Sequence, residues 1–136
     1  MVRITQKTRY AVRALMRLRT FGSEGATLKQ ISFKENIPVK FLEQIFSSLV
    51  KARILESKRG AEGGYRLKKD LTEVSLYDVM KALKEDIKLS RCFEFASNEC
   101  PFLPTCKAEV FWKKLQQRTL QIFMNTMLEE KDESVS

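Results

Sequence analysis

Residues 27–67 contain the pattern that most restricts what this chain can fold into. Thr27, followed three residues later by Gln30, is typical of a capping box at the start of a short helix, which we expect to end near Asn36. After a turn that contains proline, a second helix is predicted over residues 39–52. Its apolar residues fall on one face: Leu42, Ile45, Phe46 and Leu49. Two short helices joined by a few residues, the second of them amphipathic, predict a helix-turn-helix.

A glycine-rich stretch follows at residues 59–64, between two runs that are typical of strands, at 54–58 and 65–67. A β-hairpin directly after the second helix of a helix-turn-helix is the wing of a winged helix. The glycines suit a turn that needs positive φ, and they also let a backbone approach phosphates closely. A P-loop is excluded because no Gly-Lys-Ser/Thr follows and the flanking elements are not a strand and then a helix.

Three further helices are predicted from the spacing of apolar residues. The first covers residues 8–21 and carries arginines on another face: Arg9, Arg13 and Arg17. The second begins at Ser75, where Asp78 completes another capping box, and extends to about Ile87. The third covers residues 107–128.

The last predicted helix contains an apolar stripe that its own chain has little surface to cover. The stripe consists of Phe111, Leu115, Ile122, Phe123 and Met127. Packing on a second copy of the chain would bury it, and packing back on its own domain is the alternative. We therefore predict a mainly α fold with a small β-hairpin. Its parts are a winged helix-turn-helix domain over residues 1–88, a cysteine loop over 89–106, a dimerisation helix over 107–128 and a disordered tail over 129–136.

The charge of the chain is concentrated in its first half. Residues 1–70 carry 16 Lys and Arg and 6 Asp and Glu, a net of +10, whereas residues 71–136 carry 9 and 11, a net of −2; together they give the total of +8. This asymmetry indicates that the first half faces a polyanion such as double-stranded DNA. No stretch is long and apolar enough to span a membrane, and the basic N-terminus lacks the apolar block of a secretion signal, so we expect a cytoplasmic protein.

Three cysteines, Cys92, Cys100 and Cys106, lie close together in a chain that contains no histidine. In a reducing compartment such a group indicates metal or redox chemistry rather than a disulfide. Gaps of seven and five residues do not suit a zinc knuckle, but they suit a loop around an iron–sulfur cluster. The missing histidine also removes the usual general base, so an enzyme is not expected.

A fourth ligand for such a cluster would have to come from another residue type. Glu109 lies three residues after Cys106, on the same face of a helix start, and is a candidate ligand. A solvated helix glutamate is the alternative reading of Glu109. A metal-free thiol switch, with Cys92 as the reactive residue, is the alternative to the cluster.

Three segments of the chain resemble a known family. They are ITQKTRYAVRALMRL, FLEQIFSSLVKARILESKRGAEGGYRL and CKAEVFWKKL, and the similarity covers residues 2–128. The chain resembles the winged-helix regulators that include IscR, NsrR and RirA. The resemblance implies a homodimeric bacterial transcription regulator, a repressor or dual regulator, with a 2Fe–2S or 4Fe–4S cluster. It further implies sensing of iron, cluster supply, nitric oxide or redox state, and binding to a pseudo-palindromic operator.

The same resemblance implies roles for individual residues. Glu43 and Gln44 would face base edges, with Lys40 and Phe41 beside them, and Arg59 at the wing would enter the minor groove. These roles agree with the chemistry, because Glu accepts from cytosine N4, Gln pairs with adenine and Arg favours a narrow minor groove. The residues expected at phosphates are Arg9, Lys51 and Lys58.

The chain departs from the family pattern at two positions and in the gap between its first two cysteines, which is longer than usual. The IscR type has a histidine where this chain has Glu109, and the NsrR type can use an aspartate where this chain has Arg9. The type of cluster, its fourth ligand, the signal and the DNA-binding form are therefore left open. Some members of the family work without a cluster, which keeps a thiol-based redox-sensing repressor as the alternative.

Overall fold

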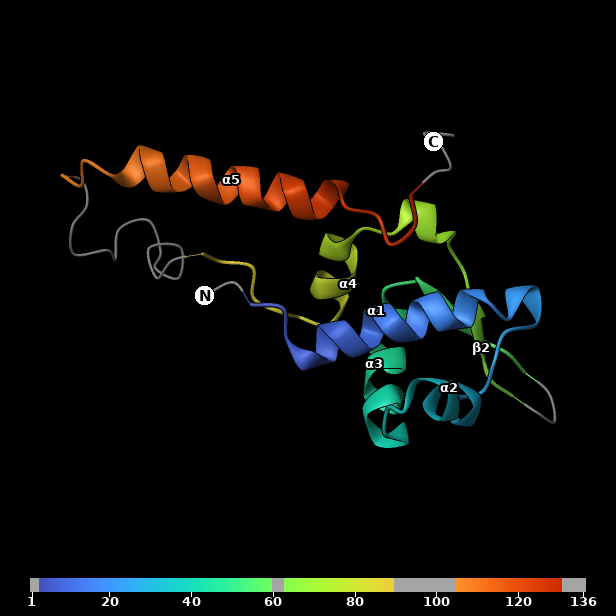
Figure 1. Ribbon diagram of the computed structural model, residues 1–136. Helices are drawn as coiled ribbons and strands as arrows, with labels where there is room; N and C mark the ends of the chain where they lie inside the picture. The colour runs from blue at the N-terminus through green and yellow to red at the C-terminus, as the bar shows by residue number, and fades with distance from the viewer. Residues whose placement is uncertain (1–2, 60–62, 90–104, 131–136) are drawn as a thin grey trace.

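The computed structural model describes residues 3–59, 63–89 and 105–130, and its elements follow the predicted order (Figure 1). The helices are α1 (Gln6–Arg19), α2 (Leu28–Glu35), α3 (Val39–Lys51), α4 (Leu76–Ala82) and α5 (Glu109–Asn125). One hairpin, formed by β1 (Leu55–Ser57) and β2 (Tyr65–Leu67), follows α3. Single turns of 3-10 helix lie at Gly22–Glu24 and Leu71–Glu73. The prediction of a mainly α fold with a small β-hairpin is confirmed. Among the described helices, none has the length and apolar character needed to cross a bilayer.

Side-chain caps set where the helices begin. The Thr5 hydroxyl accepts a hydrogen bond from the Thr8 amide at 3.2 Å, so α1 starts two residues before the predicted range of 8–21. Both predicted capping boxes are present, at the starts of α2 and α4. At the end of α2, Asn36 adopts a left-handed conformation with φ of 55°, which turns the chain into α3.

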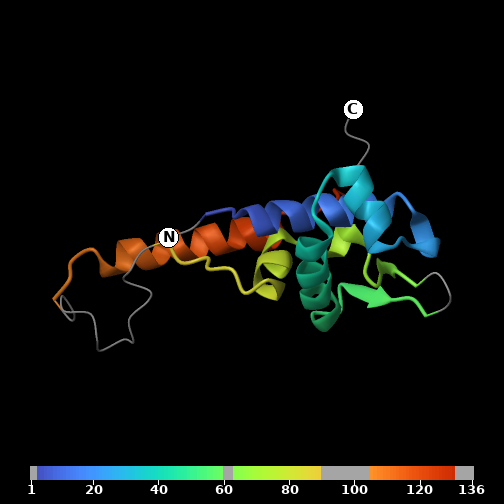
Figure 2. The same cartoon turned by 90° about the horizontal axis from the view of Figure 1, so that it is seen from below.

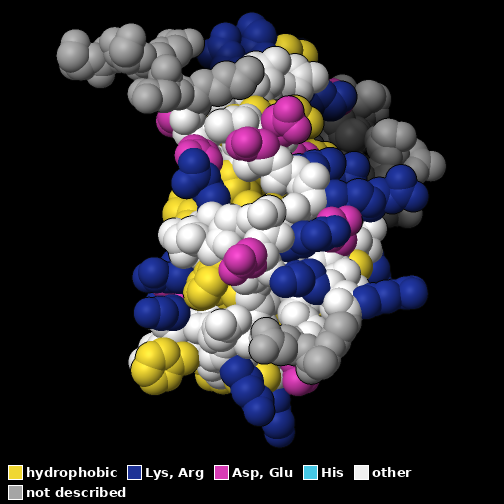
Figure 3. Space-filling view, turned by 90° about the vertical axis from the view of Figure 1, so that its right-hand side faces the viewer, with side chains coloured by type: hydrophobic (Ala, Val, Ile, Leu, Met, Phe, Trp, Pro, Cys, Tyr) yellow, Lys and Arg dark blue, Asp and Glu magenta, His cyan; other side chains and the backbone are white. Residues whose placement is uncertain are grey.

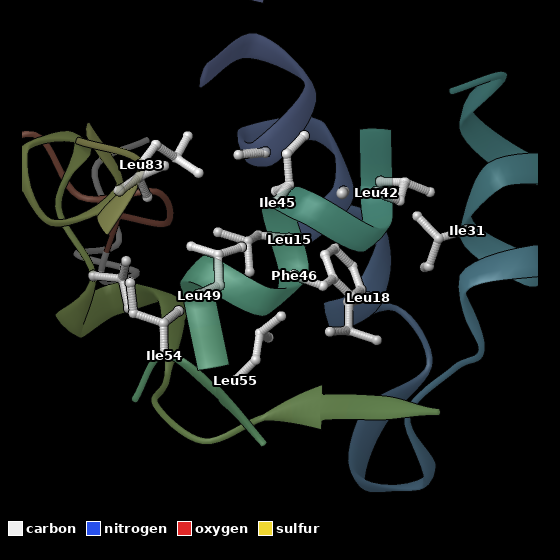
Figure 4. Packing of buried hydrophobic residues seen from close by; sticks show 14 of the residues in the cluster. Leu15, Leu18, Ile31, Leu42, Ile45, Phe46, Leu49, Ile54, Leu55 and Leu83 are labelled. Atoms are coloured by element: carbon white, nitrogen blue, oxygen red, sulfur yellow. The ribbon is translucent and has the colours of Figure 1, made fainter. Parts of the chain in front are cut away.

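The helix-turn-helix and the hairpin form a winged helix. The four apolar residues predicted for the inner face of α3 are buried: Leu42, Ile45, Phe46 and Leu49. Figure 4 shows Phe46 beside Leu18 of α1, and Leu42 directed toward Ile31 of α2. Phe46 also meets the ring of Tyr65 edge-on, with 5.1 Å between the ring centroids. A single core therefore fixes α3 to α1, to α2 and to the wing.

The wing is joined to the turn before α2 by a close backbone contact. Ala26 and Tyr65 exchange two backbone hydrogen bonds, of 2.9 and 2.8 Å, which extend the β1–β2 pair by one bridge. A Cβ atom at Gly25 would collide with the Tyr65 carbonyl oxygen, and one at Gly64 would lie 2.7 Å from the Ala26 carbonyl oxygen. Both residues have positive φ, so these glycines are required by the approach of the two backbones as well as by the turn.

Helix α4 is shorter than the sequence suggests. It ends at Ala82, so Ile87 is not part of it and lies half-buried beyond. Lys84 adopts φ of 58°, and the Glu85 amide donates to the Met80 carbonyl at 2.9 Å, which closes the helix in a Schellman-type turn. Lys84 thus occupies the position of this turn at which glycine is usual.

Helix α5 is attached to the rest of the molecule mainly at its C-terminal end. The Thr126 carbonyl accepts from the Leu76 amide at 2.8 Å, and the Leu128 amide donates to the Val74 carbonyl at 2.9 Å. Glu129 lies in the range predicted as tail, but its carboxylate is 2.5 Å from Arg19 Nε of α1. Figures 1 and 2 both show the N-terminal half of α5 extending away from the other helices.

Candidate nucleic-acid interface and cysteine region

The outward surface of α3 is polar, basic and uncovered. We define the α3 reading face as the exposed side chains of Lys40, Phe41, Glu43, Gln44, Ser47 and Lys51. Residues three and four apart share a face of a helix, so Lys40, Gln44, Ser47 and Lys51 form its centre. Glu43 and Phe41 lie on its two flanks. The opposite surface of α3 is the buried core, so the reading face is held rigidly.

Sequence reasoning selected every member of the α3 reading face except Ser47. The spacing could have identified it, because Ser47 is three residues after Gln44 and seven after Lys40. Serine hydroxyls both donate and accept hydrogen bonds, so Ser47 can contact either a base edge or a phosphate.

Phe41 is an aromatic residue that the core does not use. Its side chain is 45% exposed, and its ring meets that of Tyr10 in α1 edge-on at 5.8 Å. The guanidinium of Arg13 lies 6.0 Å from the centre of the Tyr10 ring. Contact with α1 therefore holds Phe41 at the edge of the reading face and presents apolar surface there.

The predicted basic face of α1 is partly neutralised. Glu35, at the end of α2, lies 3.3 Å from Arg13 Nε and 2.6 Å from Arg17 Nε. Arg9 is exposed and lies outside this arrangement. The Arg13–Glu35–Arg17 cluster thus ties α1 to α2, whereas the Arg9 side chain is exposed.

The two predicted cations of the wing have different environments. Lys58 is half-buried, and its ammonium group donates to the Glu24 carbonyl, so it links the wing to the turn after α1. Arg59 is exposed next to the wing tip. Figure 3 shows Lys and Arg side chains spread over the side of the molecule that carries the wing, with Asp and Glu side chains among them.

One of the three cysteines lies within the described residues. Cys106 is half-buried, forms no disulfide and precedes α5. The Glu109 amide is 3.5 Å from the Cys106 carbonyl oxygen, and the Glu109 carboxylate pairs with Lys113 at 2.7 Å. Cys92 and Cys100 lie outside the described residues. In the described ranges, no group of three or more His, Cys, Asp or Glu side chains could hold a metal ion.

Comparison with known proteins points to one family. Residues 4–130 match the family described as Rrf2, iron-dependent transcriptional regulator. The HTH-type transcriptional regulator IscR of Photorhabdus laumondii is 34% identical over 130 residues, which is 95% of this chain and 78% of that relative. The structure of CymR, the global cysteine regulator of B. subtilis, matches with a TM-score of 0.72 and 29% identity over 96% of this chain and 95% of that one. The oxidized form of Staphylococcus aureus CymR matches with a TM-score of 0.68 and 26% identity over 99% of each chain.

Proposed function

This chain belongs to the Rrf2 family of transcription regulators, and from that premise we propose that it is a homodimer whose DNA binding is controlled by an iron–sulfur cluster. It is a transcription regulator and not an enzyme. The single observation that carries DNA reading is the α3 reading face, an uncovered basic surface on a helix whose other side is buried beside a wing. Helices of this kind enter the major groove, and the wing lies over the neighbouring backbone or minor groove.

A second copy of the chain is the partner proposed for α5. Within Glu109–Asn125 no side chain is buried. Gln116, Leu120 and Phe123 are half-buried and share one face of α5. On another face, Phe111, Leu115 and Ile122 are 60%, 42% and 63% exposed. An apolar stripe of this kind on a helix that extends from its domain suits an isologous contact with a second α5.

The three cysteines are proposed as the cluster ligands. Thiolates are the usual ligands of iron–sulfur clusters, and the described thiol, Cys106, fits because it is free of disulfides and partly accessible at the start of α5. Glu109 is the candidate fourth ligand, and ligation would compete with its ion pair to Lys113. When bound, a cluster supplies redox chemistry and iron that is reactive toward nitric oxide. The loop that contains the cysteines connects α4 to α5, so a change in the loop acts on both the reading domain and the dimer helix.

A cluster-free thiol switch is the second candidate function. Its support is the match to CymR, which has been solved in an oxidized form. In that case oxidation of the thiols would replace cluster loss as the signal, and the same loop would transmit it.

Anaerobic purification with iron and acid-labile sulfide analysis separates the two candidates. If a cluster is present, the protein absorbs visible light, and a variant with Cys92, Cys100 and Cys106 all changed to Ser is colourless and no longer changes its DNA affinity with iron supply. If the thiol switch is correct, iron-free protein is colourless and loses or gains DNA binding with peroxide. Zinc without sulfide, together with DNA binding that ignores peroxide, would contradict both. If Glu109 is a ligand, the Glu109→Gln variant changes the visible absorption spectrum of the cluster-loaded protein.

Replacement of Glu43 by Ala is expected to relax base preference. A carboxylate on the reading face accepts a hydrogen bond from cytosine N4, and loss of such a contact costs about 1–3 kcal/mol of discrimination at one base pair. Sequencing of duplexes selected from a random pool by the wild type and by the variant measures the change. The control is Lys51→Ala, for which we expect weaker binding to all sequences and a shallower salt dependence. A uniform loss in Glu43→Ala, with unchanged preference, would assign Glu43 a structural role instead.

A further inference from the structure

We propose that Gln116 is a positioning residue that links the segment entering the cysteine loop to the DNA-reading domain. This inference rests on the proposed function, because it concerns how a change in the loop reaches α3. It adds a route that runs from the segment before the cysteines, through α1, to Phe41 at the edge of the reading face.

The link begins with two hydrogen bonds made by the Gln116 side chain, in the middle of α5. We call this pair of hydrogen bonds the Gln116 clasp. The Leu89 amide donates to Gln116 Oε1 at 2.9 Å, and Gln116 Nε2 donates to the Ile87 carbonyl at 3.0 Å. One glutamine therefore satisfies both a donor and an acceptor of a segment that belongs to no helix or strand of the described structure. Residues 87–89 immediately precede the segment that contains Cys92 and Cys100, so these two hydrogen bonds hold the chain at the point where it enters that segment.

The link continues from residues 85–89 into α1. Thr5 Oγ1 donates to Glu85 Oε1 at 2.6 Å, between residues 80 positions apart in the chain. Thr5 is also the N-cap of α1, so the Glu85 carboxylate sits at the positive end of that helix. Helix α1 in turn holds Phe41 of the α3 reading face through Tyr10. A continuous series of contacts therefore runs from α5 through the loop entrance and α1 to α3.

Helix α5 has a second attachment, at its C-terminal end, that can stay in place when the Gln116 hydrogen bonds break. At its C-terminal end α5 is joined to the reading domain by backbone hydrogen bonds at Leu76 and Leu128 and by the Arg19–Glu129 ion pair. Gln116 lies nine residues before Asn125, about 14 Å along the helix from that fixed end. A displacement of the cysteine loop can break or remake two side-chain hydrogen bonds without undoing the backbone attachment.

The test compares Gln116→Leu with Gln117→Leu. Leucine keeps the approximate size but removes both hydrogen bonds, and Gln117 is an exposed neighbour on the same helix. The probe is a duplex selected from a random pool by the wild type, and the measured quantity is the ratio of its Kd values for cluster-loaded and cluster-stripped protein. Linked sites typically alter affinity by about 5- to 150-fold; we expect such a ratio in the wild type and in Gln117→Leu, and a ratio within about threefold of unity in Gln116→Leu.

Hydrogen exchange gives a readout that does not depend on DNA. The Leu89 amide is expected to exchange faster in Gln116→Leu than in the wild type, and to be unchanged in Gln117→Leu. Gln116→Glu keeps the acceptor for the Leu89 amide but loses the donor to the Ile87 carbonyl, so we expect a ratio of Kd values between those of the wild type and Gln116→Leu. This variant replaces Gln116→Leu in the test if Gln116→Leu does not fold. If Gln116→Leu keeps the wild-type ratio of Kd values although its Leu89 amide exchanges fast, the link through Gln116 is overturned and the proposed gating is not. A ratio of unity in the wild type itself would overturn the proposed gating, and the link with it.

Discussion

Replacing Ile122 by Asp is expected to convert the dimer to a monomer and to weaken operator binding by at least about 100-fold. Ile122 is 63% exposed on the face of α5 that also carries Phe111 and Leu115, here called its free face, so the change costs the isolated chain little. In the proposed dimer the same position is buried against a second α5, where an unpaired carboxylate is strongly unfavourable. Two linked reading domains exceed the affinity of one by about 10²- to 10⁴-fold, which sets the size of the expected loss.

Sedimentation equilibrium and titration of a selected duplex measure the two effects of this change. The matched control is Gln117→Asp, which adds the same charge to another exposed face of α5 and should leave the dimer intact. Circular dichroism checks that both variants are folded. A dimer that survives Ile122→Asp with unchanged affinity would assign the free face of α5 to a different partner.

Replacing Phe46 by Ala is expected to destabilise the reading domain by about 3–5 kcal/mol, a large part of the 5–15 kcal/mol that typically stabilises a domain. Phe46 is fully buried on the inner face of α3, and its ring also packs against Tyr65 of the wing. The cavity left by the ring therefore loosens the recognition helix and the wing together. Urea denaturation monitored by circular dichroism gives the change in the free energy of unfolding.

The chain contains a matched control for this prediction. Phe33 on α2 is 84% exposed, so the identical change, Phe33→Ala, should alter the free energy of unfolding by no more than about 0.5 kcal/mol. A similar loss in both variants would mean that Phe46 is not the centre of the core described above.

The reading domain was largely predictable because its signals are local. Thr27 with Gln30, and Ser75 with Asp78, start helices through hydrogen bonds between residues three apart, and both capping boxes are present in the structure. The apolar spacing of α3 correctly assigned its buried face. The residues proposed for its reading face came from the family resemblance, and the structure shows that their side chains are exposed. The end of α4 was predicted wrongly, because Lys84 takes a left-handed conformation that is usually associated with glycine and that no local sequence signal indicates.

The role of individual charged residues was less predictable. Arg13 and Arg17 share a face with Arg9 in the sequence pattern, but only the structure shows Glu35 between the first two. Likewise Lys58 contacts the Glu24 carbonyl, across 34 positions of the chain. Charge patterning locates a basic surface, but it does not reveal which cations are already engaged by a distant residue.

The sequence by itself determined the winged helix, the basic character of the half of the chain that contains it and the presence of three thiols before a long amphipathic helix. These follow from periodicity, capping and composition, which act over a few neighbouring residues. Only the tertiary structure decided that α5 is fastened to the reading domain by its C-terminal end, that Gln116 holds the loop entrance and that Thr5 meets Glu85. Those contacts join segments from 27 to 80 positions apart, and their pairing depends on how the packed core brings the segments together rather than on any local pattern.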